Sequence, residues 1–160
     1  MFIEPIIAFL GLIAGFFLNK TVKEELEPGK KYFRILSMLL LIILIVISPF
    51  TNLVLIGAII GILLSIVMKN PYFSLGILTM VSTLTGKLAL VSSLVFIFGL
   101  SYSSWFYRII DKKYLLESLV LFFIPFFLLF SSKILLNYDL ILGIGIGGTL
   151  GVILKGFKSL

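Results

Sequence analysis

The sequence predicts an all-α integral membrane protein with about seven short transmembrane helices, and three observations predict it. Of its 160 residues, 61% are hydrophobic and 12% charged, with a mean hydropathy of +1.27. Soluble domains are roughly half apolar and about a quarter charged. Apolar runs recur along the whole chain, separated by turn or charge signals. A glycine-spaced apolar segment also occurs twice, at residues 55–69 and 141–155, and ends on lysine both times.

Seven apolar runs are candidates for membrane spans. In chain order they are Phe2–Leu18, Tyr32–Ile47, Leu53–Met68, Tyr72–Thr85, Leu88–Tyr107, Tyr114–Ser131 and Leu140–Leu154. The first helix is able to extend over Asn19–Glu27 before Pro28-Gly29 breaks it.

The fourth and fifth runs leave alternatives open. Tyr72–Tyr107 is read either as one overlong helix or as a hairpin that turns at Gly86-Lys87. A further reading makes Tyr72–Thr85 a re-entrant segment, which other helices would have to bury.

Basic residues decide between six and seven spans, because cytoplasmic loops carry an excess of lysine and arginine. With the N-terminus outside, seven spans place eleven of the thirteen basic residues in the cytoplasm and leave only Lys87 and Lys133 outside. Six spans would put the basic cluster at 108–113 opposite Lys69. The count therefore predicts seven spans and a cytoplasmic C-terminus. The six tyrosines and Trp105 lie at predicted span ends, where headgroups favour amphipathic rings.

The two glycine segments correspond residue by residue, which predicts an internal repeat. The matched sets are Gly57, Ile60, Gly61, Leu64, Lys69 and Gly143, Ile146, Gly147, Leu150, Lys155. Upstream, Lys31-Tyr32 mirrors Lys113-Tyr114 before another aliphatic run. We expect a single transmembrane domain over residues 1–160 in a 3+1+3 arrangement. Its two parallel three-helix repeats cover about 2–70 and 88–158, and a linking helix covers about 72–86.

This plan of two parallel three-helix units joined by one helix resembles that of the SWEET sugar transporters. The resemblance concerns the architecture alone. The chain contains no glutamine, so it lacks the proline–glutamine signature of that family. The resemblance implies a transporter, as an analogy of fold.

Small residues four apart lie on one face of a helix, where they let two helix backbones approach closely. The same faces line a pathway if the helices bend, and crowded glycines weaken the last helix. Pro125 predicts a kink in the sixth run. The packing or hinge candidates are Gly11, Gly15, Gly57, Gly61, Gly143, Gly147, Gly151 and Pro125.

Polar residues inside the spans gather in the hairpin between the fourth and fifth runs. In one interpretation the hydroxyls bond back to their own helix and Lys87 extends to the outer interface. In the other they form a polar groove where Lys87 attracts an anion or pairs with Glu4. The pathway or ligand candidates are Thr79, Ser82, Thr83, Lys87, Ser92 and Ser93.

Several function classes are disfavoured by composition. The chain has no cysteine and no histidine, and no carboxylate falls at a predicted midplane position. We therefore expect no catalytic residues, no metal site, no cofactor and no enzymatic activity. The net charge of +6 is read as cytoplasmic loop charge, so we expect no nucleic-acid partner.

The sequence predicts a multi-pass protein of the cell membrane whose activity is open between two classes. The first is a small transporter or channel with a pathway between the two repeats. The alternative is a non-catalytic subunit or assembly factor whose glycine faces bind another membrane protein. The expected partners are the lipid bilayer and either another membrane protein or further copies of the chain.

Overall fold

The computed structural model of the chain describes residues 3–21, 23–68, 70–105, 112–130 and 137–158. Over these residues the fold is all-helical, with seven α-helices, one 3₁₀ helix and no strand. The elements are α1 (Ile3–Thr21), α2 (Lys23–Val46), α3 (Asn52–Val67), α4 (Tyr72–Leu84), α5 (Leu88–Trp105), α6 (Lys112–Phe123), η1 (Ile124–Phe130) and α7 (Tyr138–Lys158).

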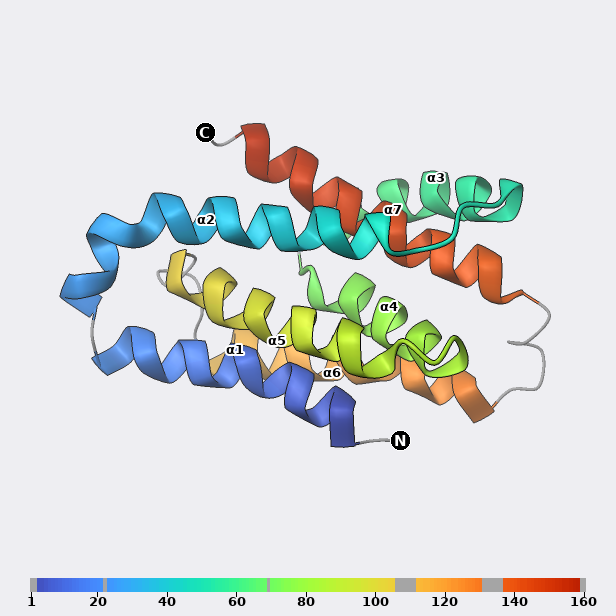
Figure 1. The fold of residues 1–160 in the computed structure, drawn as a ribbon. Coiled ribbons are helices and arrows are strands. Elements are labelled where there is room, and N and C mark those ends of the chain that lie inside the picture. The colour runs from blue at the N-terminus through green and yellow to red at the C-terminus, as the bar shows by residue number, and fades with distance from the viewer. Residues whose placement is uncertain (1–2, 22, 69, 106–111, 131–136, 159–160) are drawn as a thin grey trace.

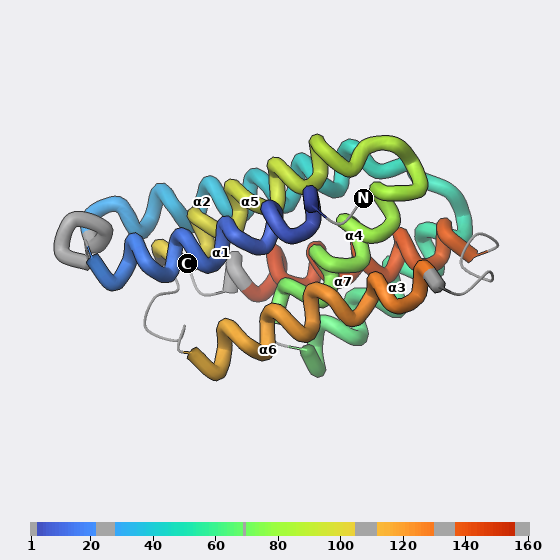
Figure 2. Tube along the Cα trace, turned by 90° about the horizontal axis from the view of Figure 1, so that it is seen from below, coloured from blue at the N-terminus to red at the C-terminus, as the bar shows by residue number. Residues whose placement is uncertain are grey.

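Successive helices alternate in direction along one elongated bundle. Figure 1 shows α1, α3, α5 and α7 running one way and α2, α4 and α6 running the other. The view from below in Figure 2 shows the same alternation, with α6 on the side away from α2. One end of the bundle therefore carries the α2–α3 connection and the α4–α5 turn, and the other carries the starts of α2 and α6.

The hairpin reading of Tyr72–Tyr107 is confirmed, and the reading as one long helix is wrong. α4 ends at Leu84 and α5 begins at Leu88. Between them Gly86 has φ +70, a left-handed conformation that glycine adopts without steric cost. The 13 residues of α4 give it a length of about 20 Å at 1.5 Å per residue. Neighbouring helices bury most of its residues.

The expected helix break at Pro28-Gly29 is wrong. Pro28 lies inside α2, which begins at Lys23, and α1 ends at Thr21. Pro28 is exposed and lies near the start of α2, where a proline removes a single helical hydrogen bond. Figure 1 shows the N-terminal part of α2 bent relative to the rest, as an internal proline causes.

Pro125 marks a change of helix type. The α-helical pattern of α6 ends at Phe123, and the chain continues as the 3₁₀ helix η1. A proline lacks the N–H of the i→i−4 bond and disfavours the α conformation in the residue before it. The glycines of α7, in contrast, do not interrupt it, since it is one continuous α-helix.

The largest helix–helix interface of the described residues joins α3 and α7, and it is built on glycine. Gly57 lies against the Leu140 carbonyl and Gly143, and a Cβ atom at Gly57 would overlap that carbonyl oxygen. Gly61 meets Ile144 and Gly147 in the same way. Each glycine lies beside the glycine 86 residues further along the chain, so the two helices run parallel and in register. Their backbones are in direct contact.

A second parallel contact of this kind joins α1 and α5, the next largest interface. A Cβ atom at Gly11 would overlap the backbone of Phe96, and one at Gly99 would overlap the backbone of Leu12. Gly15 faces the Ser103 hydroxyl. Gly99 was not among the packing residues predicted from the sequence. Neither was Gly76, which brings α4 against the α6 backbone.

Apolar side chains cover both the interior and much of the surface. The outer face of α3 exposes large side chains such as Leu55, Ile59 and Val67 at 56%, 62% and 81%. Two helical segments, α1 and residues 138–155 of α7, are long and apolar enough to cross a membrane. α3, α4 and residues 88–104 of α5 are shorter apolar helices.

Adding a methyl group at a glycine contact should separate the helices. We expect Gly61→Ala to lower the free energy of unfolding by about 1–3 kcal/mol, the usual effect of overpacking. Gly29→Ala is the matched control, because its Cβ meets only the movable Phe33 ring edge at 3.0 Å. Alanine there should be neutral or slightly stabilising. Thermal and denaturant unfolding of the purified variants measures both, and equal stabilities would contradict the assigned α3–α7 contact.

Candidate functional site

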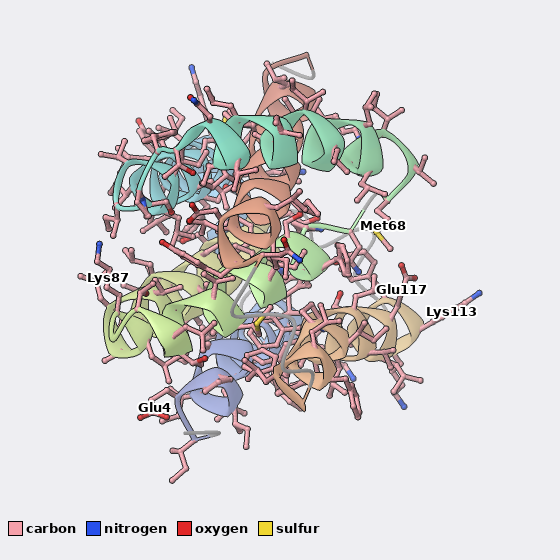
Figure 3. All side chains as sticks on the ribbon, turned by 90° about the vertical axis from the view of Figure 1, so that its right-hand side faces the viewer. Glu4, Met68, Lys87, Lys113 and Glu117 are labelled. Carbon is pink, nitrogen blue, oxygen red and sulfur yellow. The ribbon has the colours of Figure 1, made fainter. Side chains whose placement is uncertain are left out.

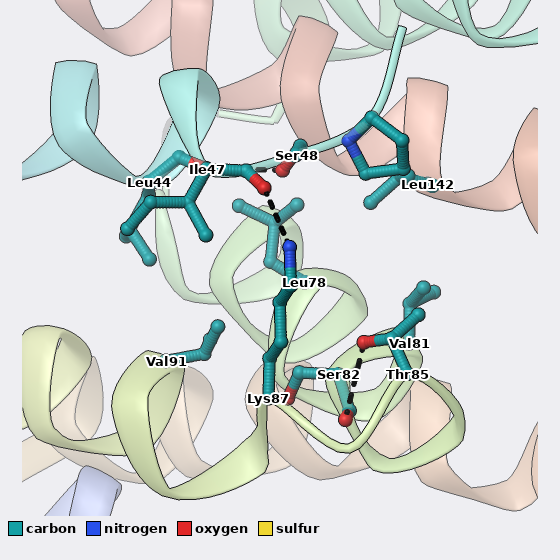
Figure 4. Close-up of a pocket in the computed structure, with 11 residues that line it drawn as sticks. Leu44, Ile47, Ser48, Leu78, Val81, Ser82, Thr85, Lys87, Val91 and Leu142 are labelled. Carbon is teal, nitrogen blue, oxygen red and sulfur yellow. Dashed lines mark hydrogen bonds between the residues drawn. The ribbon is translucent and has the colours of Figure 1, made fainter. Parts of the chain in front are cut away.

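A cavity of about 180 Å³ lies where α2, α4, α5 and α7 meet, near the end of the bundle that carries the α4–α5 turn. Figure 4 shows it with the residues that line it. The lining residues are Leu44, Ile47, Ser48, Pro49, Leu78, Val81, Ser82, Thr85, Lys87, Val91 and Leu142. Most of this wall is aliphatic.

Lys87 is the one charged residue among those that line the cavity. Its side chain reaches from the α4–α5 turn to the end of α2, where Nζ donates a hydrogen bond of 3.1 Å to the Ile47 carbonyl (Figure 4). The last carbonyls of a helix lack helical partners and carry the negative end of the helix dipole. Lys87 therefore caps α2. Figure 3 shows Glu4 and Lys87 apart on the edge of the bundle, and Lys87 does not pair with Glu4.

The hydroxyls of the cavity wall bond to their own helices. Ser82 Oγ donates to Thr79 O at 2.6 Å, and Thr85 Oγ1 donates to Ser82 O at 3.4 Å. On the opposite wall Ser48 Oγ donates to Leu44 O at 3.0 Å. Such bonds satisfy a hydroxyl proton inside an apolar environment. Lys87 is therefore the residue of the wall with side-chain protons left to donate.

The structure separates the six pathway or ligand candidates. Ser82 and Lys87 line the cavity described above. Ser92 and Ser93 line a different, open cavity of about 310 Å³ between α1 and α5, together with Glu4. Thr79 and Thr83 line neither cavity. The Thr79 hydroxyl donates to Leu75 O at 2.7 Å, and the Thr83 hydroxyl donates to Met80 O at 2.6 Å. Both side chains therefore bond to the backbone of their own helix, α4.

None of the eight packing or hinge candidates lines either cavity. The glycines instead lie at contacts with neighbouring helices, where their missing side chains allow close approach. Gly151 faces Ser65 at the same offset of 86 residues as the other α3–α7 contacts.

A polar network at the start of α4 was not identified in the sequence. Asn70 Nδ2 donates to Ser118 Oγ at 2.8 Å, and Asn70 Oδ1 accepts from the Tyr72 N–H at 3.0 Å. Beside them the Tyr102 and Tyr114 hydroxyls lie 3.0 Å apart. In the sequence, Asn70 precedes a proline, a pattern typical of an exposed turn. In the structure Asn70 is buried, at 4% exposed, which this pattern does not predict.

An aromatic cluster surrounds the fully buried Tyr72 ring. Its neighbours are Phe9, Phe98, Tyr102 and Phe122, with ring centroids 5.7–6.3 Å from that of Tyr72. The sequence interpretation assigned Tyr72 and Tyr102 to the headgroup level, whereas both rings are buried against other helices. Tyr72 lies six residues before Leu78 of the cavity wall, about 9 Å along α4. The cluster therefore lies deeper in the bundle than the cavity.

Lys155 repeats the arrangement seen at Lys87. Its Nζ donates to the Ser65 carbonyl in the last turn of α3. Its counterpart in the other glycine segment, Lys69, lies outside the described residues. Two lysines thus bind carbonyls at the C-terminal ends of other helices, an arrangement that charge and dipole favour.

The described residues contain no group of three or more histidine, cysteine, aspartate or glutamate side chains placed to hold a metal ion. Comparison of the chain with protein families, with curated proteins and with solved structures finds no match.

Removing the Asn70 side chain should destabilise the fold. We expect Asn70→Ala to lower the free energy of unfolding by about 1–3 kcal/mol, because buried Ser118 and the Tyr72 N–H lose their partner. Asn137→Ala is the control, since Asn137 is exposed and uses its backbone carbonyl for Ile141. Chemical denaturation of both variants measures the difference. A loss at Asn137 as large as that at Asn70 would contradict the role of the network.

Proposed function

We propose that the chain is a multi-pass protein of the cell membrane that passes a small molecule through the interior of its helix bundle, as a transporter or channel. The observation that carries the proposal is the position of the Lys87 cavity. It lies where helices of both proposed repeats, α2 on one side and α5 and α7 on the other, meet the linking helix α4.

Three features support the membrane location. The seven helices alternate in direction, as seven consecutive spans require. Large aliphatic side chains cover the outer face of α3, and contiguous exposed apolar side chains are typical of membrane or protein interaction surfaces. The exposed Lys20 lies in the last turn of α1, and the exposed Lys112 and Lys113 begin α6. These helix ends lie at the end of the bundle opposite the α4–α5 turn that carries Lys87, in agreement with a cytoplasmic side rich in basic residues.

The proposed pathway differs from the sequence expectation in its position. The glycine faces of α3 and α7 are closed by direct backbone contact, and so are those of α1 and α5. These faces leave no room for a pathway between them. The cavity beside α4 is the better candidate. The Tyr72 aromatic cluster lies about 9 Å further along α4.

The glycine contacts also bear on the alternative of a subunit or assembly factor. That proposal used the glycine faces to bind another membrane protein, but within this chain they bind each other. The outer face of α3 is then one of the exposed apolar surfaces left for a partner. Recovery of a stoichiometric membrane protein in mild purification would favour this second class, and a monodisperse homo-oligomer alone would count against it.

The topology is open to a direct test, because the chain has no cysteine to interfere. We expect Thr85→Cys and Lys112→Cys to react with a membrane-impermeant thiol reagent from opposite sides of the membrane. Both positions are exposed and lie at opposite ends of the bundle. Labelling of both from the same side would overturn the seven-span arrangement.

Access to the cavity tests the pathway. We expect Ser82→Cys to react with a small water-soluble thiol reagent from the side on which Thr85→Cys reacts, since Ser82 lines the cavity. Thr149→Cys is the control, because Thr149 is fully buried and lines neither cavity. If Ser82→Cys is as unreactive as Thr149→Cys from both sides, the aqueous pathway is excluded.

A further inference from the structure

We propose that the Lys87 cavity recognises a small organic monoanion, a carboxylate with an apolar body of about the size of benzene. The carboxylate binds the Lys87 ammonium and the body occupies the aliphatic part of the cavity. This inference rests on the proposed function, because it assigns a substrate class to the same cavity.

The charge of the cavity selects an anion. Lys87 is the one charged residue of its lining, and no carboxylate is among the lining residues. An ammonium group has three N–H donors. Within the described part of the chain, Nζ uses one of them, on Ile47 O. Two donors are left for the oxygens of a ligand. A single cation matches one negative charge, and a dianion would bring a second, uncompensated charge.

The hydroxyl groups that line the cavity do not donate hydrogen bonds to an anionic ligand. Ser48, Ser82 and Thr85 donate their protons to backbone carbonyls. A hydroxyl has one proton, so these groups face a ligand only as acceptors. Acceptors do not bind carboxylate oxygens. The Lys87 ammonium is therefore the group whose removal should abolish the preference for an anion.

The size and walls of the cavity select the body of the ligand. An apolar cavity of about 150 Å³ is able to hold a benzene molecule, and this one measures about 180 Å³. Leu44, Leu78, Val81, Val91 and Leu142 supply aliphatic walls from four helices. Burial of an apolar body against them is favourable in proportion to the area removed from water.

Lys87 is placed so that both parts of such a ligand are accommodated. Its side chain is exposed, while Val81, Val91 and Leu142 of the wall are at most 7% exposed. The bond to Ile47 O holds the ammonium at the end of α2, where the aliphatic wall meets solvent (Figure 4). The carboxylate thus keeps part of its hydration while the body is buried, which avoids the cost of burying a charge completely.

The test uses the full-length protein in lipid nanodiscs, with benzoate as the probe and neutral benzamide as its uncharged counterpart. Isothermal titration calorimetry gives both dissociation constants. We expect benzoate to bind at least about tenfold more tightly than benzamide to the native protein, the effect of a hydrogen bond to a charged group. Benzoate should also slow labelling of Ser82→Cys.

Variants assign the preference to Lys87. Lys87→Gln keeps a donor for Ile47 O and removes the charge, so we expect it to bind benzoate and benzamide alike. Lys87→Arg should keep the preference for benzoate. Lys31→Gln removes an exposed charge outside the cavity and should behave as the native protein does.

Equal binding of benzoate and benzamide to the native protein overturns the substrate class, and so does a preference for benzoate that survives in Lys87→Gln. The first result does not depend on the folding of a variant, because it uses the native chain, and the second is itself a sign of a folded variant, since Lys87→Gln has to bind benzoate. The two proposals fail separately. An unreactive Ser82→Cys overturns the pathway, whereas a reactive Ser82→Cys together with equal binding overturns only the choice of a monoanion.

Discussion

Direct contact between helix backbones is the constraint on which the rest of this structure depends. α3 meets α7, and α1 meets α5, at positions where a methyl group would overlap a backbone atom of the other helix. Close approach of this kind increases van der Waals contact, which drives helix association where the surroundings are as apolar as the side chains. Both contacts join parallel helices far apart in sequence. Three helices lie between the two members of each pair, so a chain whose helices alternate in direction brings the members of each pair together in parallel.

Local sequence signals were sufficient for most helix boundaries and for the faces of the glycines. Hydrophobic runs located the helices, and Gly86-Lys87 located the turn that its left-handed glycine makes. The helix break predicted at Pro28 was wrong, because a proline near the start of a helix removes one hydrogen bond without ending the helix. The repeated spacing identified Gly57 and Gly143 as packing positions, but spacing cannot say that a glycine has its own counterpart as its neighbour. That information lies in the packing of α3 against α7.

The candidate site was harder to predict, because its residues are adjacent only in space. Lys87 was a predicted site residue because it is a single charge within an apolar region. Its hydrogen-bond partner, however, is a backbone carbonyl 40 residues earlier, which the sequence does not indicate. Ser82 and Ser92 lie in the same predicted hairpin and face two different cavities, since they project from α4 and α5 in different directions. No sequence pattern predicted the role of Asn70. Its role depends on Ser118, which folding of α6 brings beside it.

The two glycine contacts have a mechanical consequence. Helices in backbone contact cannot slide or tilt against each other without losing that contact, so α1 with α5, and α3 with α7, each form a stiff pair. The Lys87 cavity takes one wall from each pair, α5 from the first and α7 from the second, with α2 and α4 between them. A rocking motion of one pair against the other would change the width of the cavity while leaving each pair intact.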